Sequence, residues 1–499
     1  MAVQPSYPGV YIEELPKGTR TIVGVATSIT AFVGRTRWGA VEHPIDCFSF
    51  ADFERECGGL WADSELGQAV AQFFLAGGGQ AIVCRVATGA TTSTTTIAGV
   101  TGGSLALTAA SAGAWGGSLR VTVDHGTSGS LDETPDDLTF HLELAQLDAA
   151  GQTFRREQFF AVSVDPAAPR WIGRLLEQES KLARVTAAPA RRPIEVNAQA
   201  FSSAIDGGNG SVTDYTAAID RLDHVDTVNL VCVPPLSATA DTPLAVWTAA
   251  EALCKRRRAM LVVDPPAAWA TAQNAADLAG GMTALRSENA AFYWPAIIAP
   301  DPLQEGRPRR FAPCGVVAGT IARIDANRGV WKSPAGIEAT LPGVLRTAIA
   351  VTDADSGLVN PRGVNALRDR PPAGAVIWGA RTARGADLLA SQWKYLAVRR
   401  LALYIEESLW RGTQWAVFEP NDAPLWTELR KAIDSFMQQL MRQGALQGAR
   451  ASDAYFVRCD STTTTADDVD RGIVNIIVGF APLQPAEFVV LHFKQIAGQ

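Results

Sequence analysis

Five histidines and one serine-containing loop are the residues of this chain that could support general-base or nucleophilic chemistry. None of the histidines lies in an HExxH or nucleophile-elbow context; they are His43, His125, His141, His224 and His492. His224, within RLDHVD before an expected strand, is the best candidate for a catalytic base, and a surface or strand-edge histidine is the alternative. Ser128 lies in GTSGS, which has the composition of a serine-protease loop, but no helix is expected after it. We predict no catalytic residue and no enzyme, with an α/β hydrolase that uses His224 or Ser128 as the competing class.

Two other loops have compositions found at ligand sites. The segment 207–210, GGNG, precedes an expected helix whose N-terminus could bind an anion, but the Lys-Ser/Thr of a phosphate loop is missing. The segment 353–357, DADSG, has the acidic spacing of a calcium loop without its closing Glu. We expect a turn at both segments, and we predict neither a cofactor nor a metal ion.

The composition is that of a large globular protein. A chain of 499 residues suggests about three domains, and 47% apolar with 19% charged residues is ordinary. The net charge of −7 disfavours nucleic-acid binding, and no apolar run approaches the ~18 residues of a membrane span. The N-terminus has no signal-peptide pattern. The seven cysteines include no CxxC pair, which indicates reduced thiols, and Cys84, Cys232 and Cys314 lie in apolar runs. We therefore expect cytoplasmic synthesis, no direct nucleic-acid partner and no membrane insertion.

Prolines and changes of pattern divide the chain into five expected segments. Pro5, Pro8 and Pro16 exclude a long helix, and residues 9–14 alternate as a strand does, which predicts an extended arm. Near residue 87 the composition shifts to Thr, Gly and Ala with short alternating runs, which predicts an inserted β-rich domain on the outside of the fold. The expected segments are the arm 1–22, the first part of a central α/β domain 23–88, the β-rich insertion 89–197, the rest of the central domain 198–384, and a C-terminal domain 385–499.

The central segments alternate apolar strands with helices, which predicts an α/β fold. Expected central strands are 30–34, 80–86, 227–233, 259–263 and 291–298, and expected strands of the insertion are 119–123, 138–144 and 158–164. Expected helices are 49–54 with Ser49 as a cap, 64–75, 212–222, 244–257 and 269–286. Strands that are apolar throughout and separated by helices indicate a mainly parallel sheet.

The C-terminal segment has an α+β pattern. A helix is expected at 387–399, before the run VRRLALYIEESLWRGTQWAVFEPND at 398–422, in which a charged helix, a turn at Gly412 and a second apolar run follow one another. The next expected helix, 424–446, has an apolar face of Leu425, Leu429, Ile433, Phe436, Met437 and Leu440. Its opposite polar stripe is Thr427, Lys431, Asp434, Gln438 and Arg442. A last strand is expected at 487–496.

A series of motifs resembles contractile tail sheath proteins, which form the outer cylinder of contractile phage tails and related injection machines. In chain order the motifs are YPGVYIEE, TAFVGRTRWG, SFADFERECGGL, DGGNGSVTDYTAAIDRLDHVDTVNLVCVP, NRGVWKSPAG, NPRGVNALR, VIWGARTA, the 398–422 run and PAEFVV. Each motif is weak alone, but their order extends over most of the chain outside the insertion.

The resemblance implies a structural subunit that assembles with copies of itself around an inner tube protein, as hexameric stacked rings or a helix. Such a sheath contracts from an extended, high-energy form and drives the tube through a target envelope. It also implies baseplate and tail terminator proteins as partners, synthesis in a bacterial cytoplasm, and assembly into a phage tail or phage-tail-like particle. A type VI secretion sheath is the alternative within this class, and those sheaths are usually split over two chains.

Both expected terminal strands lack a partner within the chain, so each can add to the sheet of a neighbouring copy. Such head-to-tail contacts generate open helical assemblies. The residues predicted to exchange are Val10, Tyr11, Ile12, Phe488, Val489, Val490, Leu491 and Phe493. The resemblance further implies that the C-terminal domain faces the tube, and the predicted tube contacts are Lys431, Asp434, Gln438 and Arg442. Exposed ion pairs are worth only ~0–1 kcal/mol each, which suits a contact that breaks on contraction.

Overall fold

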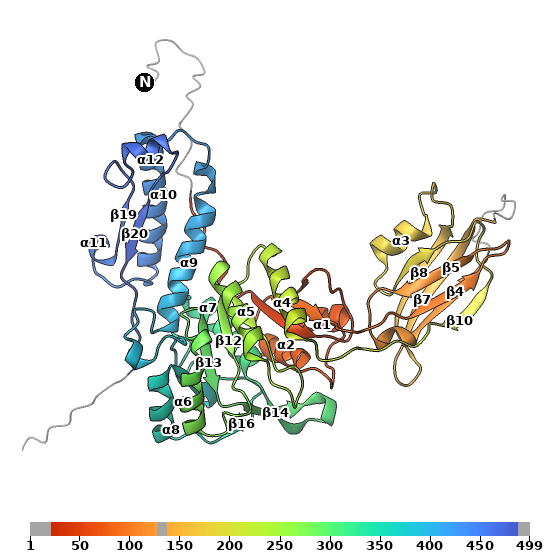
Figure 1. Cartoon of the computed structure of the whole chain (residues 1–499), viewed down its shortest axis with the longest axis horizontal. Coiled ribbons are helices and arrows are strands. Elements are labelled where there is room, and N and C mark those ends of the chain that lie inside the picture. The colour runs from red at the N-terminus through yellow and green to blue at the C-terminus, as the bar shows by residue number, and fades with distance from the viewer. Residues whose placement is uncertain (1–20, 127–136, 488–499) are drawn as a thin grey trace, which may run out of the picture.

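The protein is elongated, with three bodies along its long axis (Figure 1). The computed structural model describes residues 21–126 and 137–487. A β domain lies at one end, an α/β body lies in the middle, and two long helices with a small sheet stand at the other end. Within the described residues, no helix is both long enough and apolar enough to cross a membrane.

An eight-stranded sheet forms the central body, in the order β18-β17-β13-β12-β11-β1-β3-β2. Neighbouring inner strands are parallel, and the two edge strands, β2 and β18, are antiparallel to their neighbours. The strands are β1 Thr30–Arg35, β2 Ile45–Cys47, β3 Ala81–Val86, β11 Leu230–Cys232, β12 Met260–Val263, β13 Ala290–Trp294, β17 Val364–Arg370 and β18 Gly374–Ile377. The predicted, mainly parallel sheet is confirmed.

Helices cover both faces of this sheet, so its inner strands are buried on both sides. One core includes Tyr215, Trp247 and Ala275 from α4, α5 and α6; the other includes Phe53 and Phe73 from α1 and α2, with the buried face of α7. The helices are α1 Phe50–Cys57, α2 Leu66–Leu75, α4 Val212–Asp220, α5 Leu244–Arg256, α6 Ala272–Gly281, α7 Cys314–Arg328 and α8 Asp353–Val359, with short 3-10 turns η2 Arg221–His224, η3 Thr283–Leu285, η4 Pro302–Gln304 and η5 Asn360–Arg362. The predicted cap is confirmed, because the Ser49 side chain accepts from the backbone N–H of Asp52.

The expected strand 291–298 is wrong as a single element. It is divided between β13 of the large sheet and β14 Ile297–Asp301, which belongs to a separate antiparallel sheet with β15 Arg307–Phe311 and β16 Arg346–Thr347. Pro295 separates the two strands, and a proline has no N–H with which to continue a ladder. The apolar pattern runs through the break, because both strands are mainly buried.

The β domain contains two antiparallel sheets around one core, which includes Leu107, Val121, Leu142 and Leu176. The sheets are β10-β6-β7-β8 and β4-β5-β9. Their strands are β4 Thr94–Ala98, β5 Ser104–Ala109, β6 Leu119–Asp124, β7 Thr139–Leu147, β8 Thr153–Ser163, β9 Ala183–Ala187 and β10 Val196–Ala200, with α3 Ile172–Glu179 and η1 Ala114–Ser118 between them. β10 ends at Ala200, beyond residue 197, which is the predicted end of the insertion. The five segment boundaries stay a prediction.

Two long helices dominate the C-terminal domain. They are α9 Leu396–Gly412 and α10 Ala423–Arg442, and the smaller elements are η6 Asp387–Leu389, η7 Gln414–Ala416, α11 Ala451–Ala454, β19 Tyr455–Arg458, α12 Ala466–Asp470 and β20 Ile477–Phe480. The predicted apolar face of α10 is confirmed, since all six of its residues are buried. The side chain of Asp422 caps this helix by accepting from Leu425 N–H at 3.0 Å. Gly444 follows its end with a φ of 75°.

The expected helix at 387–399 is wrong, because α9 begins at Leu396. Residues 394–396 are held extended against the central body: Thr382 N–H donates to the carbonyl of Lys394 at 3.0 Å, and Leu396 N–H donates to that of Ala380 at 2.9 Å. An extended backbone paired in this way cannot be helical. The apolar run that begins at 398 is therefore the interior of one helix that ends at Gly412.

Candidate functional site

A two-stranded antiparallel sheet on the surface of the C-terminal domain has open edges. β19 pairs with β20 from Tyr455 opposite Phe480 to Arg458 opposite Ile477, and neither strand has a second partner strand among the described residues. The sheet is attached to α10, because the Tyr455 hydroxyl donates to Asp434 Oδ1 at 3.1 Å. Two-stranded sheets are only marginally stable alone, and open edges present unpaired N–H and C=O groups. The sheet can therefore accept further strands.

The first and last described parts of the chain lie at opposite ends of α9. Ile22 packs on Gly412, the last residue of α9. At the other end, Glu487 accepts from Arg381 Nε and Nη2, both at 2.7 Å, and from the hydroxyl of Tyr395. A helix of this length is about 25 Å long. The first and last described residues therefore lie at opposite ends of this helix.

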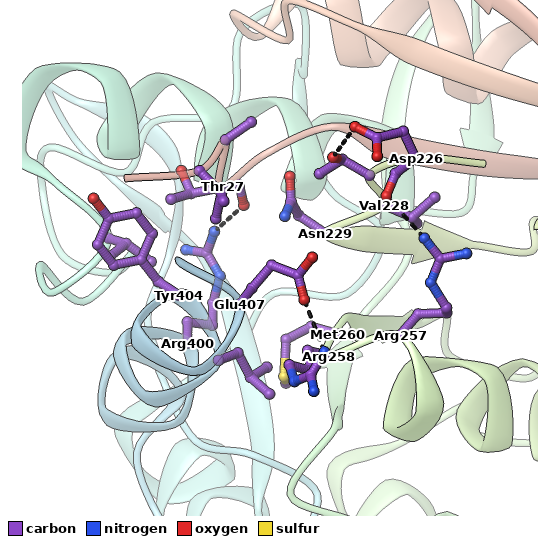
Figure 2. Close-up of a pocket in the computed structure, with 15 residues that line it drawn as sticks. Thr27, Asp226, Val228, Asn229, Arg257, Arg258, Met260, Arg400, Tyr404 and Glu407 are labelled. Carbon is purple, nitrogen blue, oxygen red and sulfur yellow. Dashed lines mark hydrogen bonds and ion pairs between the residues drawn. The ribbon is translucent and has the colours of Figure 1, made fainter. Parts of the chain in front are cut away.

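Residues 22–29, which we call the strap, run antiparallel to α9 before entering β1. Val25 N–H donates to Ser408 Oγ at 3.2 Å, and Gly24 lies so close to Tyr404 that a Cβ there would be 1.8 Å from its hydroxyl. Figure 2 shows Arg400 of α9 pointing to the strap, where Nη2 donates to the carbonyl of Thr27 at 2.9 Å. The strap thus links the N-terminal end of the described chain to α9.

A buried ion pair connects the strap, α9 and α7. Arg400 Nη1 donates to Asp325 Oδ1 at 2.8 Å, and both side chains are 3% exposed. Thr27 Oγ1 donates to the second oxygen of Asp325 at 2.7 Å. Because removing one partner leaves an uncompensated buried charge, loss of such a pair costs about 3–5 kcal/mol. The central body and the C-terminal domain are therefore held together at this point.

A second group of charges lies beside the first, between α9 and the loops that precede β11 and β12. Glu407 accepts from Arg258 at 2.9 Å and from Arg411 at 2.8 Å, and Figure 2 shows the contact with Arg258. Arg411 also pairs with Asp226 at 2.9 Å, and this hydrogen bond lowers the pKa of the Asp226 carboxyl. Asp226, Arg258 and Glu407 line a small pocket that leaves little space for a ligand. We therefore interpret it as a joint between domains.

The structure does not assemble a catalytic group from the residues considered for that role. His224 is exposed at the end of η2, and Ser128 lies outside the described residues. In the described chain, no cluster of three or more His, Cys, Asp or Glu side chains has metal-ligand geometry. All seven cysteines are buried.

The two loops with ligand-site composition have structural roles. Arg35 binds the 207–210 turn, donating to the carbonyl of Gly207 at 3.2 Å and to Asn209 Oδ1 at 3.1 Å. The segment bends at Asn209, between Gly207 and Gly210 with φ values of 73° and 84°, and the tight turn stays a prediction. At 353–357 the expected turn is wrong: these residues begin α8, with Thr352 and Asp355 forming a capping box.

The predicted tube contacts lie together on the exposed face of α10. Lys431, Asp434, Gln438 and Arg442 are all exposed, and Asp434 also accepts from the Tyr455 hydroxyl. Their role stays a prediction. The residues predicted to exchange between subunits, Val10, Tyr11 and Ile12 with Phe488, Val489, Val490, Leu491 and Phe493, lie outside the described residues. Glu487, the expected first residue of the last strand, is described and lies in no strand.

Two family models match this chain. The phage tail sheath protein central domain matches residues 208–383, and the phage tail sheath C-terminal domain matches residues 390–496. The tail sheath protein of Enterobacteria phage T4 is 25% identical over 182 residues, which is 36% of this chain and 26% of that protein. The tail sheath protein of Burkholderia phage BcepMu is 30% identical over 138 residues, 27% of this chain and 29% of that protein. The chain thus matches just over a quarter of the length of these relatives.

Solved structures are similar over almost the whole chain. The sheath of an extracellular contractile injection system in its contracted state, the PVC sheath complex, superposes with a TM-score of 0.63 and 23% identity, covering 99% of both chains. The sheath tail protein of Listeria innocua has a TM-score of 0.63 at 14% identity, covering 93% of this chain and 96% of that one. The two matched models, which together cover more than half of the chain, define a structural protein of phage tails, and the solved structures share its fold. The chain belongs to the contractile tail sheath family.

Sequence reasoning missed the strap contacts and the sheet that can accept strands. The runs YFVR and IVGF, which form β19 and β20, are short and rich in aromatic and β-branched residues, and this signal could have identified both strands. No local signal links Thr27 to Arg400, because 373 positions separate them.

Proposed function

We propose that this subunit polymerises around an inner tube and contracts to drive the tube through a target envelope. Its partners are copies of itself in hexameric rings, the tube protein, and baseplate and tail terminator proteins. It is made in a bacterial cytoplasm and assembled into a phage tail or phage-tail-like particle, with a structural and not a catalytic role. The observation that carries this proposal is the β19–β20 sheet, whose two outer edges have no partner among the described residues.

Strand exchange is the link that we propose between subunits. Residues 1–20 and 488–499 each provide an alternating segment, and β19–β20 offers two edges, one for each incoming strand. Backbone hydrogen bonds would supply the link, and alternate side chains would set the register. The ends of the described chain support this arrangement, because they lie about one helix length apart along α9 and therefore reach different neighbours.

The test is assembly of the purified chain, followed by electron microscopy. The full chain should form long hollow cylinders, and deletion of residues 1–20 should give a folded monomer that forms none. Phe456→Ser, at a ring that is 47% exposed on β19, should also impair assembly without unfolding the monomer. Phe154→Ser, at an exposed phenylalanine of the β domain, is the matched control and should assemble normally. Normal cylinders from the deletion would refute strand exchange.

We also propose that the exposed stripe of α10 contacts the tube. The stripe carries Lys431 and Arg442, which an acidic tube surface could pair, and its exposure supports this role. Each exposed pair is worth ~0–1 kcal/mol, so the contact is weak per subunit and strong when repeated.

A further inference from the structure

A buried arginine holds the last described residue of the chain. Glu487 accepts two hydrogen bonds from Arg381, from Nε to Oε1 and from Nη2 to Oε2, each at 2.7 Å. The Arg381 side chain is 1% exposed, and the Glu487 side chain is 17% exposed. Two parallel bonds between a guanidinium and a carboxylate fix the orientation of the two groups as well as their distance. We call Arg381 and Glu487 the clamp.

Further donors surround the Glu487 carboxylate. Asn360 Nδ2 donates to Oε1 at 2.9 Å, and the Tyr395 hydroxyl donates to Oε2 at 3.3 Å. Lys394 Nζ lies 3.9 Å from Oε2. Burial opposes the charge of this group, but the hydrogen bonds from Arg381 and Asn360 outweigh it and lower the pKa of the Glu487 carboxyl. Glu487 is therefore held as a carboxylate from several sides.

Arg381 is fixed in turn to the central sheet. Its backbone N–H donates to Asn365 Oδ1 at 2.7 Å, and its carbonyl accepts from Asn365 Nδ2 at 2.8 Å. Asn365 is buried in β17. Nη1 of Arg381 also donates to the carbonyl of Asn360 and to Asp387 Oδ1, both at 2.9 Å. The clamp thus connects the end of the described chain directly to the eight-stranded sheet.

The backbone pairing that precedes the clamp ends several residues earlier. Gln447 N–H donates to the carbonyl of Ala481 at 2.8 Å, and Leu446 forms an isolated bridge with Pro482. Residues 483–487 then lie in no helix or strand. Five extended residues reach roughly 17 Å. Without the clamp, the start of segment 488–499 could therefore move over a distance of this order.

We propose that the clamp sets the starting point from which residues 488–499 reach a neighbouring copy. The proposal rests on the strand exchange proposed above, and it adds the residue pair that positions the exchanged segment. A segment that starts from a fixed point close to its binding edge has a higher effective concentration there than one that starts from a mobile point. The strap is likewise held by a buried arginine, Arg400, so each end of the described chain has an anchor of this kind.

Glu487→Gln in the full chain tests the clamp, because it removes the charge and keeps the size of the side chain. A spin label on Ala486→Cys reports mobility next to the clamp, since Ala486 is exposed and all seven native cysteines are buried. Below the concentration at which cylinders form, the label should become more mobile in Glu487→Gln, while the midpoint of thermal unfolding stays that of the parent.

Assembly gives the second readout. The chain concentration at which half of the protein pellets as cylinders should rise about tenfold in Glu487→Gln, as expected for the loss of charge-assisted hydrogen bonds. A merely structural role would lower the thermal midpoint, which the positioning role leaves unchanged. Glu179→Gln, at an exposed glutamate of α3, is the matched control and should change neither the label, the midpoint nor the assembly.

A pair of insertions keeps the test independent of the stability of the clamp. Gly-Ser inserted directly after Glu487 leaves the clamp intact and adds roughly 7 Å of chain between it and the neighbouring edge. This variant should need a several-fold higher concentration to assemble, because a longer tether lowers the effective concentration. The same insertion between Leu483 and Gln484 lies before the clamp, and this variant should assemble as the parent does.

The outcomes separate the clamp from the assembly itself. A label that stays immobile in Glu487→Gln overturns the inference, because other contacts then fix the segment. A mobile label with unchanged assembly also overturns it, and so do two insertions that act alike. In each of these cases, cylinders formed by the parent leave the sheath proposal standing. A parent chain that forms no cylinders overturns the sheath proposal and this inference with it.

Discussion

The Arg400 guanidinium of α9 and the Asp325 carboxylate of α7 form an ion pair from which solvent is excluded, with 2.8 Å between Nη1 and Oδ1. The hydroxyl and carbonyl of Thr27 complete the site. Three segments from the start, middle and end of the chain therefore meet at one pair of charges. This site, together with the Glu407 group beside it, holds the C-terminal domain on the central body.

Arg400→Leu should lower the free energy of unfolding by about 3–5 kcal/mol, because Asp325 remains as a buried, unpaired carboxylate. Urea unfolding followed by tryptophan fluorescence measures the effect. The double variant with Asp325→Leu should recover most of the loss, since it leaves no charge behind. The exposed pair Arg328–Glu338 is the control, and Arg328→Leu should change stability by at most about 1 kcal/mol. Equal losses in the single and double variants would contradict this account.

Gly24→Ala should destabilise the strap, because the new methyl group would lie 1.8 Å from the Tyr404 hydroxyl. Tyr404 packs near Phe436, with 6.1 Å between ring centroids, so its ring cannot move freely. We expect a loss of about 1–3 kcal/mol, as for other overpacked sites, measured by thermal unfolding. Tyr404→Phe should rescue part of it by removing the oxygen. Gly79→Ala, at an open position, is the matched control. A neutral Gly24→Ala would show that the strap is not fixed against α9.

Asp264 should make stability depend on pH. Its side chain follows β12, is buried, and accepts from Cys314 N–H at 2.8 Å, while Oδ2 has no partner among the described residues. Burial raises the pKa of this carboxyl from 3.8 to about 7. The folded state therefore holds a proton that the unfolded state has released between pH 4 and 7, so stability falls as pH rises through this window and is level above it.

Asp264→Asn should remove this fall. At pH 8 the variant should be more stable than the parent, by at most roughly 4 kcal/mol, because one pKa unit corresponds to about 1.4 kcal/mol. At pH 4 it should have no advantage. Denaturation curves at several pH values measure the difference, and Asp277→Asn, at an exposed carboxylate, should leave the pH profile unchanged. A parallel profile for parent and Asp264→Asn would contradict the prediction.

Lys431→Glu should weaken attachment to the tube while leaving the subunit folded, because Lys431 is exposed on α10. Each subunit would lose up to about 1 kcal/mol at low salt, and the difference between parent and variant should shrink at raised salt, which screens these exposed charges in both. Co-sedimentation of sheath with tube protein, at low and raised salt, measures it. Arg174→Glu on α3 reverses an exposed charge in the β domain and should have no effect. Unchanged co-assembly at both salt concentrations would count against α10 as the tube-facing element.

The local pattern of apolar and polar residues predicted the elements whose buried side chains recur at regular spacing along the chain. The spacing of Leu425, Leu429 and Ile433 predicted α10 and its buried face. Apolar runs gave the parallel sheet, because strands covered by helices on both faces contain few polar residues. The start of α9 could not be predicted in this way, because backbone pairing of 394–396 with 380–382 determines it.

The candidate site was predictable only in part. The exposed stripe of α10 follows from helical periodicity. The open edges of β19–β20 exist because no other described strand pairs with them, and the local sequence carries no sign of this. The exposure of Phe418 is likewise a property of the folded surface. An apolar residue in a run such as WAVF is expected to be buried, and only the structure shows that this one is not.

The direction of the strap determines how the subunit bears mechanical load. Because residues 22–27 run antiparallel to α9, tension applied to the amino terminus along the helix axis is distributed over Ile22, Val25 and Thr27 at once, as shear. A segment loaded in shear detaches only when all of its contacts break together. A segment that is peeled away loses its contacts one after another. In the proposed assembly, traction from an adjoining copy would therefore pass through the strap into β1 and the central sheet.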